Sequence, residues 1–199
     1  VATQTQDMVA IGHQALAGGD PSGGNTAVGS QSMSTATVGA YNTAVGATAL
    51  KVVTAASNVA VGFEAGLAIT SGAANVIIGK SALKTATTVA AGVFIGTGSG
   101  EDIPAAQAIS GTVAVGYESM KGSGSTNASA INNTAIGSEA LKAVTTGSNN
   151  VAVGQGALST RTDGVKNTAI GALALANNGG DENTAIGYAA LNIATAGSN

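Results

Sequence analysis

Hydrophobic and polar positions repeat along this chain as a five-residue phrase, Asn-Thr-Ala-Val/Ile-Gly, that returns about every 17 residues. A glycine closes each copy, and these repeat glycines are Gly12, Gly29, Gly46, Gly62, Gly79, Gly96, Gly116, Gly137, Gly154, Gly171 and Gly187. Their successive intervals are 17, 17, 16, 17, 17, 20, 21, 17, 17 and 16 residues. Such a period is typical of solenoid proteins, so the sequence predicts a single array of eleven turns over residues 1–199.

Two columns of β-branched residues predict a short strand in every turn. The residue directly before the repeat glycine is always Val or Ile, and the third residue before it is always Val or Thr. Residues two apart on a strand share one face. The residue between them is Ala in nine turns, with Ile77 and Phe94 as the exceptions. We therefore expect a bare alanine face that packs closely against identical chains, with Phe94 buried at that subunit contact.

The glycine and asparagine columns indicate backbone requirements. We expect the repeat glycine to supply either a positive φ at a corner or a close approach that a Cβ would block. Asn stands four residues before the glycine in eight turns, and it suits a left-handed corner or a ladder of stacked amides. The structural repeat positions predicted in this way are Asn25, Gly29, Asn42, Gly46, Asn58, Gly62, Asn75, Gly79, Asn133, Gly137, Asn150, Gly154, Asn167, Gly171, Asn183 and Gly187.

Composition changes this picture by making self-association necessary. The chain has 30 Gly, two Phe, three Tyr and no Trp, so it is poor in the large side chains that build a core. We therefore expect an obligate oligomer. The formal charge of −3 argues against phosphate binding to nucleic acid, and no apolar run is long enough to insert into a membrane.

The phrase from Asn133 to Leu141, Asn-Thr-Ala-Ile-Gly-Ser-Glu-Ala-Leu, resembles the YadA-like head repeat of trimeric autotransporter adhesins. Similar Asn-Thr-Ala-Val-Gly arrays occur in bacteriophage tail fibres, although the family repeat is usually somewhat shorter. The resemblance implies an all-β fold, a parallel β-solenoid wound as a left-handed β-roll. It also implies a homotrimer, with two short strands in each coil and alanine faces meeting near the threefold axis.

Candidate catalytic and metal-binding residues are few. His13 is the only histidine and lies in a variable column that we expect to be exposed, without a second His or a Cys to complete a metal site or a triad. Glu64, Glu118 and Glu139 occupy one column in separate turns, as expected of a polar outer stripe. We therefore expect no enzymatic activity, no metal and no cofactor.

The two longest turns are consecutive and carry their extra residues in 101–111 and 121–131. Insertions in neighbouring coils of a solenoid emerge on one side, so they predict a bulge that touches a receptor. The alternative is a tolerated surface insertion. The candidate binding residues of this bulge are Asp102, Ile103, Pro104, Gln107, Lys121, Ser123, Ser125 and Asn127.

Together these patterns favour a non-enzymatic fibre segment, a trimeric β-roll shaft or head of a phage tail fibre or surface adhesin involved in host attachment. Its expected location is extracellular, on a virion or on the bacterial cell surface. The alternative is that the roll is itself the module that binds a host cell-surface receptor or glycan, as in a bacterial trimeric autotransporter adhesin.

Overall fold

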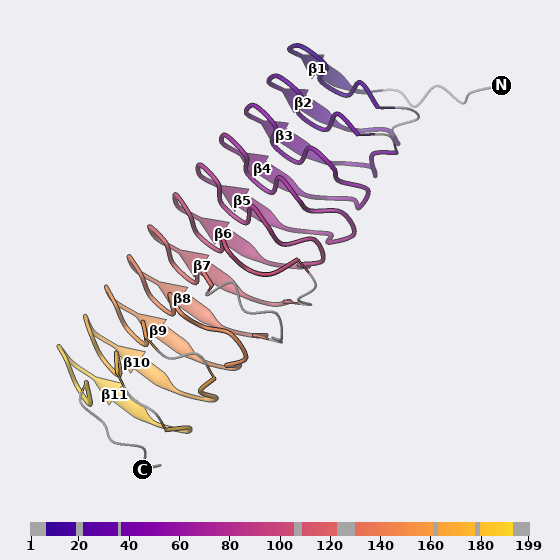
Figure 1. The fold of residues 1–199 in the computed structure, drawn as a ribbon. Helices are drawn as coiled ribbons and strands as arrows, with labels where there is room; N and C mark the ends of the chain where they lie inside the picture. The colour runs from indigo at the N-terminus through magenta and orange to yellow at the C-terminus, as the bar shows by residue number, and fades with distance from the viewer. Residues whose placement is uncertain are drawn as a thin grey trace.

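The computed structural model describes residues 7–18, 22–35, 37–105, 109–122, 130–160, 163–177 and 180–192. Within these residues, eleven three-residue strands, one in each turn, form a single sheet (Figure 1). They are β1 (Val9–Ile11), β2 (Thr26–Val28), β3 (Thr43–Val45), β4 (Val59–Val61), β5 (Val76–Ile78), β6 (Val93–Ile95), β7 (Val113–Val115), β8 (Thr134–Ile136), β9 (Val151–Val153), β10 (Thr168–Ile170) and β11 (Thr184–Ile186).

Every strand pairs in parallel with the strand of the next turn, in sequence order from β1 to β11. The register aligns equivalent positions, as where Thr26 pairs with Thr43 and Val28 with Val45. The coils stack along one axis, with the two ends of the stack far apart (Figure 1). This arrangement confirms the predicted parallel β-solenoid with turns of about 17 residues.

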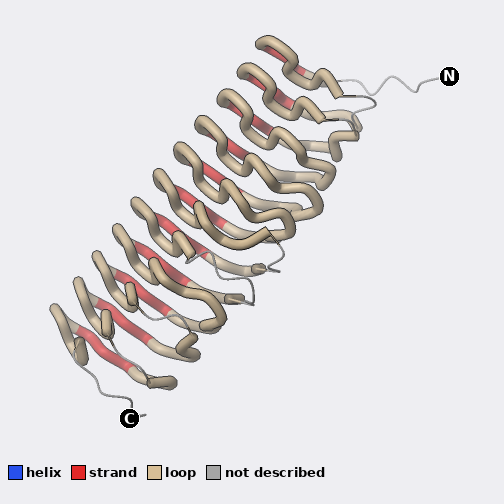
Figure 2. Tube along the Cα trace, viewed as in Figure 1, coloured by secondary structure: helices blue, strands red, loops and turns tan. Residues whose placement is uncertain are grey.

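The rest of each turn is not a second strand, contrary to what the resemblance implies (Figure 2). Outside the eleven strands, the described residues form only one isolated bridge, between Ala90 and Ser110. The reason is local: residues two and four after the repeat glycine adopt positive φ, as at Thr48 (57°) and Leu50 (47°). Alternating left-handed residues curl the chain into a tight corner and exclude an extended strand.

Both explanations proposed for the repeat glycine are confirmed. Its φ lies between 124° and 140° in all eleven turns, a region that side-chain-bearing residues rarely adopt. A Cβ on Gly62 would also lie 2.6 Å from the carbonyl oxygen of Gly79 in the next turn. The strict glycine column therefore follows from backbone geometry and from close contact between turns.

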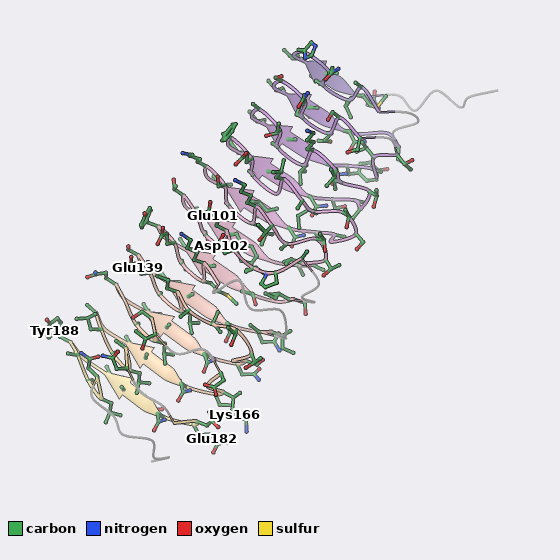
Figure 3. All side chains as sticks on the ribbon, in the orientation of Figure 1. Glu101, Asp102, Glu139, Lys166, Glu182 and Tyr188 are labelled. Carbon is green, nitrogen blue, oxygen red and sulfur yellow. The ribbon has the colours of Figure 1, made fainter. Side chains whose placement is uncertain are left out.

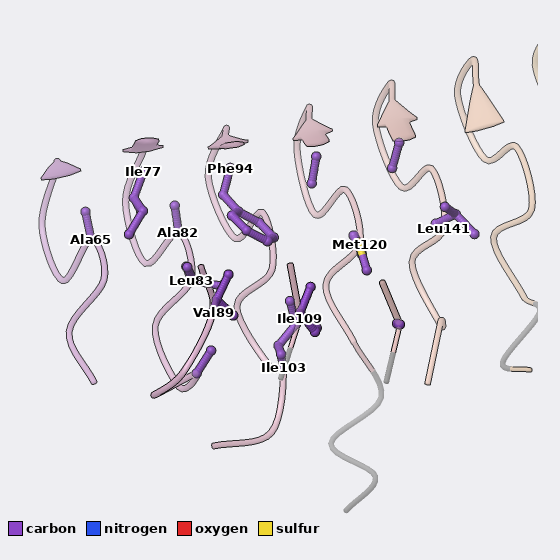
Figure 4. Close-up of a cluster of buried hydrophobic side chains, with 14 of the residues drawn as sticks. Ala65, Ile77, Ala82, Leu83, Val89, Phe94, Ile103, Ile109, Met120 and Leu141 are labelled. Atoms are coloured by element: carbon purple, nitrogen blue, oxygen red, sulfur yellow. The ribbon is translucent and has the colours of Figure 1, made fainter. Parts of the chain in front are cut away.

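The alanine column faces the interior of the chain's own coil, so the prediction that it meets other chains is wrong. Ala27, Ala44 and Ala60 are fully buried inside single coils, together with the Leu or Met four residues after the glycine in the inner turns, such as Met33, Leu50 and Leu175. Figure 4 shows side chains from the strands pointing into the coil toward Leu83, Val89 and Met120. The coil is narrow, so it can only accommodate a small residue on most strands.

Phe94 is also buried inside the coil rather than at a subunit contact. The two turns that lack Leu or Met four residues after the glycine explain how the large strand residues fit. A Cβ on Gly66 would lie 2.9 Å from Ile77 Cδ1, and one on Gly100 would lie 2.7 Å from Phe94 Cδ1. Each enlarged strand residue is therefore matched by the loss of a facing leucine, which keeps the interior volume filled.

The predicted asparagine ladder is present, but its members do not take the left-handed conformation. Asn58 donates its side-chain amide to Asn42 Oδ1 at 3.2 Å, and Asn75 donates to Asn58 Oδ1 at 3.0 Å. The left-handed residue is instead the one before each Asn, such as Ser57 (φ 62°). Each Asn points inward and is buried, where its amide satisfies backbone groups of neighbouring turns.

Candidate interaction face

The β-branched residues of all eleven strands point outward and form one continuous surface, which we call the outer face. It consists of the residues one and three before each repeat glycine, from Val9 and Ile11 to Thr184 and Ile186. Burial along the strands shows the alternation directly, since the middle residue of every strand from β2 to β11 is buried and its two neighbours are not. Eleven strands at a spacing of about 4.8 Å make the outer face roughly 50 Å long.

The exposed large hydrophobic side chains of the described residues gather on or beside the outer face. Nine of them belong to it: Val9, Ile11, Val45, Val59, Val61, Ile78, Ile136, Ile170 and Ile186. Four aromatic residues flank it, namely Tyr41, Phe63, Tyr117 and Tyr188, and Met8 and Leu191 lie in the terminal turns. A concentrated apolar surface of this kind marks an interaction site in a soluble protein.

The exposure of the outer face is unusual because the sheet is parallel. Parallel sheets are normally covered on both faces, because their connections place other elements there. In this chain the return segments of the coil cover only the inner face (Figure 2). The outer face therefore has the composition of a buried surface and no covering element among the described residues.

Two columns of residues border the outer face, one at each end of the strands. The leading edge column, five residues before each glycine, is Asp7, Gly24, Tyr41, Ser57, Ala74, Ala91, Gly111, Asn132, Asn149, Lys166 and Glu182. The trailing edge column, one residue after each glycine, is His13, Ser30, Ala47, Phe63, Lys80, Thr97, Tyr117, Ser138, Gln155, Ala172 and Tyr188. In Figure 3, Tyr188 lies at one side of the sheet, and Lys166 and Glu182 lie together at the other.

The leading edge column has an unusual backbone. All eleven of its residues have positive φ. They include Tyr41 (61°), Ala74 (59°) and Lys166 (56°), which are residue types that rarely adopt this conformation. All members except Gly24 are exposed. This column places a side chain beside the outer face in every turn except those of Gly24 and Gly111.

Ion pairs lie along the corner that follows the trailing edge column. Lys142 Nζ lies 2.7 Å from Glu118 Oε2 and 2.9 Å from Glu139 Oε1, and Lys121 Nζ lies 3.0 Å from Glu118 Oε1. Lys121 Nζ also lies 3.7 Å from Glu101 Oε2. Hydrogen bonds from Lys142 and then Lys121 lower the pKa of Glu118 to about 2, and Glu118 in turn raises the pKa of both lysines.

Glu64 of the predicted polar stripe is also paired with a lysine. Glu64 Oε2 lies 2.8 Å from Lys84 Nζ, and this hydrogen bond lowers the pKa of Glu64. His13 is exposed, as expected. Across the described residues, no three His, Cys, Asp or Glu side chains come together as a metal site would require. That part of the chain also contains no helix able to cross a membrane.

The predicted receptor-binding bulge is only partly described by the structure. Asp102, Pro104 and Lys121 are half-buried, with Lys121 engaged in the ion pairs above. Ile103 is buried in the core at 2% exposure, so it was wrongly assigned to a receptor-touching surface. An isoleucine in the longer turn fills the coil interior beside Phe94 (Figure 4). Gln107, Ser123, Ser125 and Asn127 lie outside the described residues, and the binding role of this bulge stays a prediction.

The outer face was missed as a contact surface, although the sequence held a signal for it. Asn, Ala and Gly stand four, two and zero residues from the repeat glycine, so they share one face of the strand. A column of asparagines that form an amide ladder requires burial, which places the alanines inside and the β-branched residues outside. No protein-family model matches this chain and no curated protein matches it, so its resemblance to the YadA-like head repeat rests on the repeat phrase itself.

Proposed function

We propose that this chain is a non-enzymatic structural segment of an extracellular fibre, assembled as a homotrimer of parallel, left-handed β-rolls. The three outer faces turn toward a common axis and bury each other. The segment acts as a rigid shaft or head in a phage tail fibre or bacterial surface adhesin involved in host attachment. The observation that carries the proposal is the set of exposed Val and Ile side chains on seven of the strands, from β1 to β11.

The physical properties of the outer face support this role. Val, Ile and Thr have stiff side chains, so a surface made of them loses little rotamer entropy when it is buried. The matching register of the strands gives every turn the same outline on its sheet side, which allows identical chains to pack there along their full length. Trimeric assembly itself is inferred from the resemblance to the YadA-like head repeat.

Charged substitutions in the outer face test the assembly. The double variant V61K/I136K places two lysines on strands β4 and β8, at positions 37% and 41% exposed in the single chain. Burying an unpaired charge is costly, so we expect trimer affinity to fall at least about 100-fold in sedimentation experiments. The control is S71K, which adds a lysine at an exposed position outside the outer face and edge columns. Equal loss of assembly in both variants would contradict the proposal.

A second candidate function makes the roll itself the receptor- or glycan-binding module through the longer turns. The variant Q107A/S123A/S125A/N127A changes four predicted contact residues while leaving the buried Ile103 and Ile109 in place. A spacer keeps its full attachment to host cells in this variant, whereas a binding module loses it. Sedimentation of the same variant separates lost binding from lost assembly.

A further inference from the structure

We infer that the copies meet turn against same turn, with the leading edge column of one copy packed against the trailing edge column of the next. This inference rests on the proposed trimer and adds its register. Within one chain the two edge columns lie at opposite ends of each strand (Figure 3), so their side chains do not pack against each other. In five of the eleven turns a large side chain on one edge nevertheless stands opposite a small residue on the other.

The match is clearest where one edge carries a large side chain. Between the two terminal turns, five turns have a Tyr, Phe or Lys in one edge column, and in each the other edge has Gly, Ala or Ser. Two of these turns have the large residue on the leading edge, in the pairs Tyr41 with Ala47 and Lys166 with Ala172. Three have it on the trailing edge, in the pairs Ser57 with Phe63, Ala74 with Lys80 and Gly111 with Tyr117.

The side of the large residue changes along the array, and the small residue changes with it. Stacking within the leading edge column explains part of this pattern, since a Cβ on Gly24 would lie 2.6 Å from the Tyr41 ring and one on Gly111 would lie 2.7 Å from Asn132 Oδ1 of the same chain. It does not explain the trailing edge column, where Phe63 and Lys80 are large neighbours in adjacent turns. A packed seam between two copies does explain it, since a protruding side chain requires a small residue opposite. In the first turn the pair is Asp7 with His13, an acid opposite an imidazole. Two turns depart from the size rule, with Asn149 opposite Gln155 and Glu182 opposite Tyr188.

Shifted registers keep only part of the match, because a shift to the next turn still places Ala74 opposite Phe63 and Ala91 opposite Lys80. If each trailing residue met the leading residue of the next turn, Tyr117 would face Asn132 and Gln155 would face Lys166. With the opposite shift, Phe63 would face Tyr41. Closed cyclic symmetry also favours the unshifted pairing, because rotation about an axis along the solenoid moves no copy relative to another in the axial direction.

Engineered disulfides test the register, because the natural chain has no cysteine. Three double variants share K80C and pair it with S57C, A74C or A91C, the leading edge positions of the preceding, same and following turns. The three partner sites have nearly equal φ values of 62°, 59° and 52° and are all exposed, so they are matched in backbone and access. A shift of one turn adds about 4.8 Å along the axis, so Cα atoms about 5.5 Å apart in the matched register would lie about 7 Å apart in a shifted one, beyond the usual reach of a disulfide.

We expect A74C/K80C to form covalent oligomers under mild oxidation about tenfold faster than S57C/K80C or A91C/K80C, as measured on non-reducing gels. K80C alone forms none. Faster cross-linking of either shifted pair, in protein that still sediments as the native oligomer, overturns the register and leaves the proposed trimer intact. Sedimentation of every variant and of the unmodified protein as a folded single chain overturns the trimer, and the register with it.

Discussion

Two regions of this solenoid fill the same coil interior by different means. The flanking turns, closed by Gly29 to Gly79 and by Gly137 to Gly187, carry the buried asparagine ladder. The middle turns, closed by Gly96 and Gly116, have Gly92 and Thr112 in place of asparagine. They hold instead the largest buried side chain of the described residues, Phe94.

The geometry at Gly92 shows why the two solutions exclude each other. A Cβ there would lie 2.7 Å from Phe94 Cε2, so the aromatic ring occupies the space that an asparagine side chain needs. Asn75 Oδ1 still accepts a hydrogen bond from the Gly92 backbone N–H at 2.9 Å, which ends the ladder without leaving this acceptor unpaired. A polar ladder and a large apolar ring therefore compete for one volume inside the coil.

The middle turns compensate for the missing ladder with other contacts between turns. Serine replaces alanine three residues after the glycine, and Ser99 and Ser119 donate hydroxyl hydrogen bonds to carbonyls of the next strand, Ala114 and Ala135, at 3.0 and 3.1 Å. The ion pairs of Glu118 add a second link on the surface. Neighbouring turns of this fold can therefore be held together either by buried amides or by a large apolar side chain, hydroxyl hydrogen bonds and surface ion pairs.

The feature that both regions share is expected to produce the largest effect. G62A in a flanking turn and G96A in a middle turn each force a Cβ against the backbone of the next turn at positive φ. We expect each to cost about 3 kcal/mol or more of unfolding free energy, measured by denaturant titration at fixed chain concentration. G187A, whose Cβ would meet nothing within 4 Å, tests the φ cost alone and is expected to lose less. A large difference between G62A and G96A would show that the backbone geometry is not common to both regions.

Phe94 is expected to be the main source of apolar stability in the middle turns. F94A should cost about 3–5 kcal/mol, because it leaves a cavity facing Gly100. F94A/G100L restores the Ala and Leu of the other turns and should recover most of that loss. G100L alone is expected to destabilise, since its Cβ would lie 2.7 Å from the Phe94 ring. Chemical denaturation of all three variants gives the coupling, and additive effects would rule out the proposed exchange of volume.

The asparagine ladder is expected to matter only in the flanking turns. Asn150 donates to Gly164 O at 2.7 Å and accepts from the Asn167 backbone N–H at 2.9 Å. N150A should therefore cost about 2–3 kcal/mol by leaving buried groups unpaired, whereas N149A, at the exposed neighbour, should cost less. T112A in a middle turn should lose under about 1 kcal/mol, because Thr112 Oγ1 makes only long contacts of 3.4 and 3.5 Å. Equal losses in N150A and T112A, measured by thermal unfolding, would remove the distinction between the regions.

The ion pairs should produce the smallest effect, visible as a pH dependence. The pKa of Glu118 is lowered from 4.5 to about 2, so its contribution to stability is complete above pH 4.5 and is lost as the pH falls toward 2. E118Q should cost about 1 kcal/mol or less at pH 7, and its difference in Tm from the unmodified protein should shrink between pH 4.5 and 2. A difference that stays constant over this range would mean that the Glu118 charge does not act through these pairs.

The local structure could be predicted from the sequence because each column has a single physical requirement. Glycines at positive φ, β-branched residues two apart and asparagines at a fixed offset all indicate short strands stacked in parallel. The direction of the strand faces could not be obtained from alternation alone, because alternation is unchanged when inside and outside are exchanged. Treating the alanines as a subunit contact reversed the two faces, and the buried asparagines beside them are the observation that corrects it.

The site was harder to predict because it depends on positions with no consensus residue. The edge columns hold Tyr, Lys, Ala and Gly in no simple order, and their placement beside the outer face follows from a left-handed residue before each asparagine. Only the three-dimensional turn shows that Tyr188 and Glu182 border the same strand from opposite ends (Figure 3). The proposed pairing of these columns is between copies, so the sequence of one coil does not point to it.

The central claim is that the outer face is buried by identical chains. Sedimentation equilibrium of the unmodified protein, followed through serial dilution with circular dichroism on the same samples, tests it most directly. The account predicts a folded species of three times 18.7 kDa that loses its β-structure as it dissociates. A folded, cooperatively melting species of 18.7 kDa would contradict it.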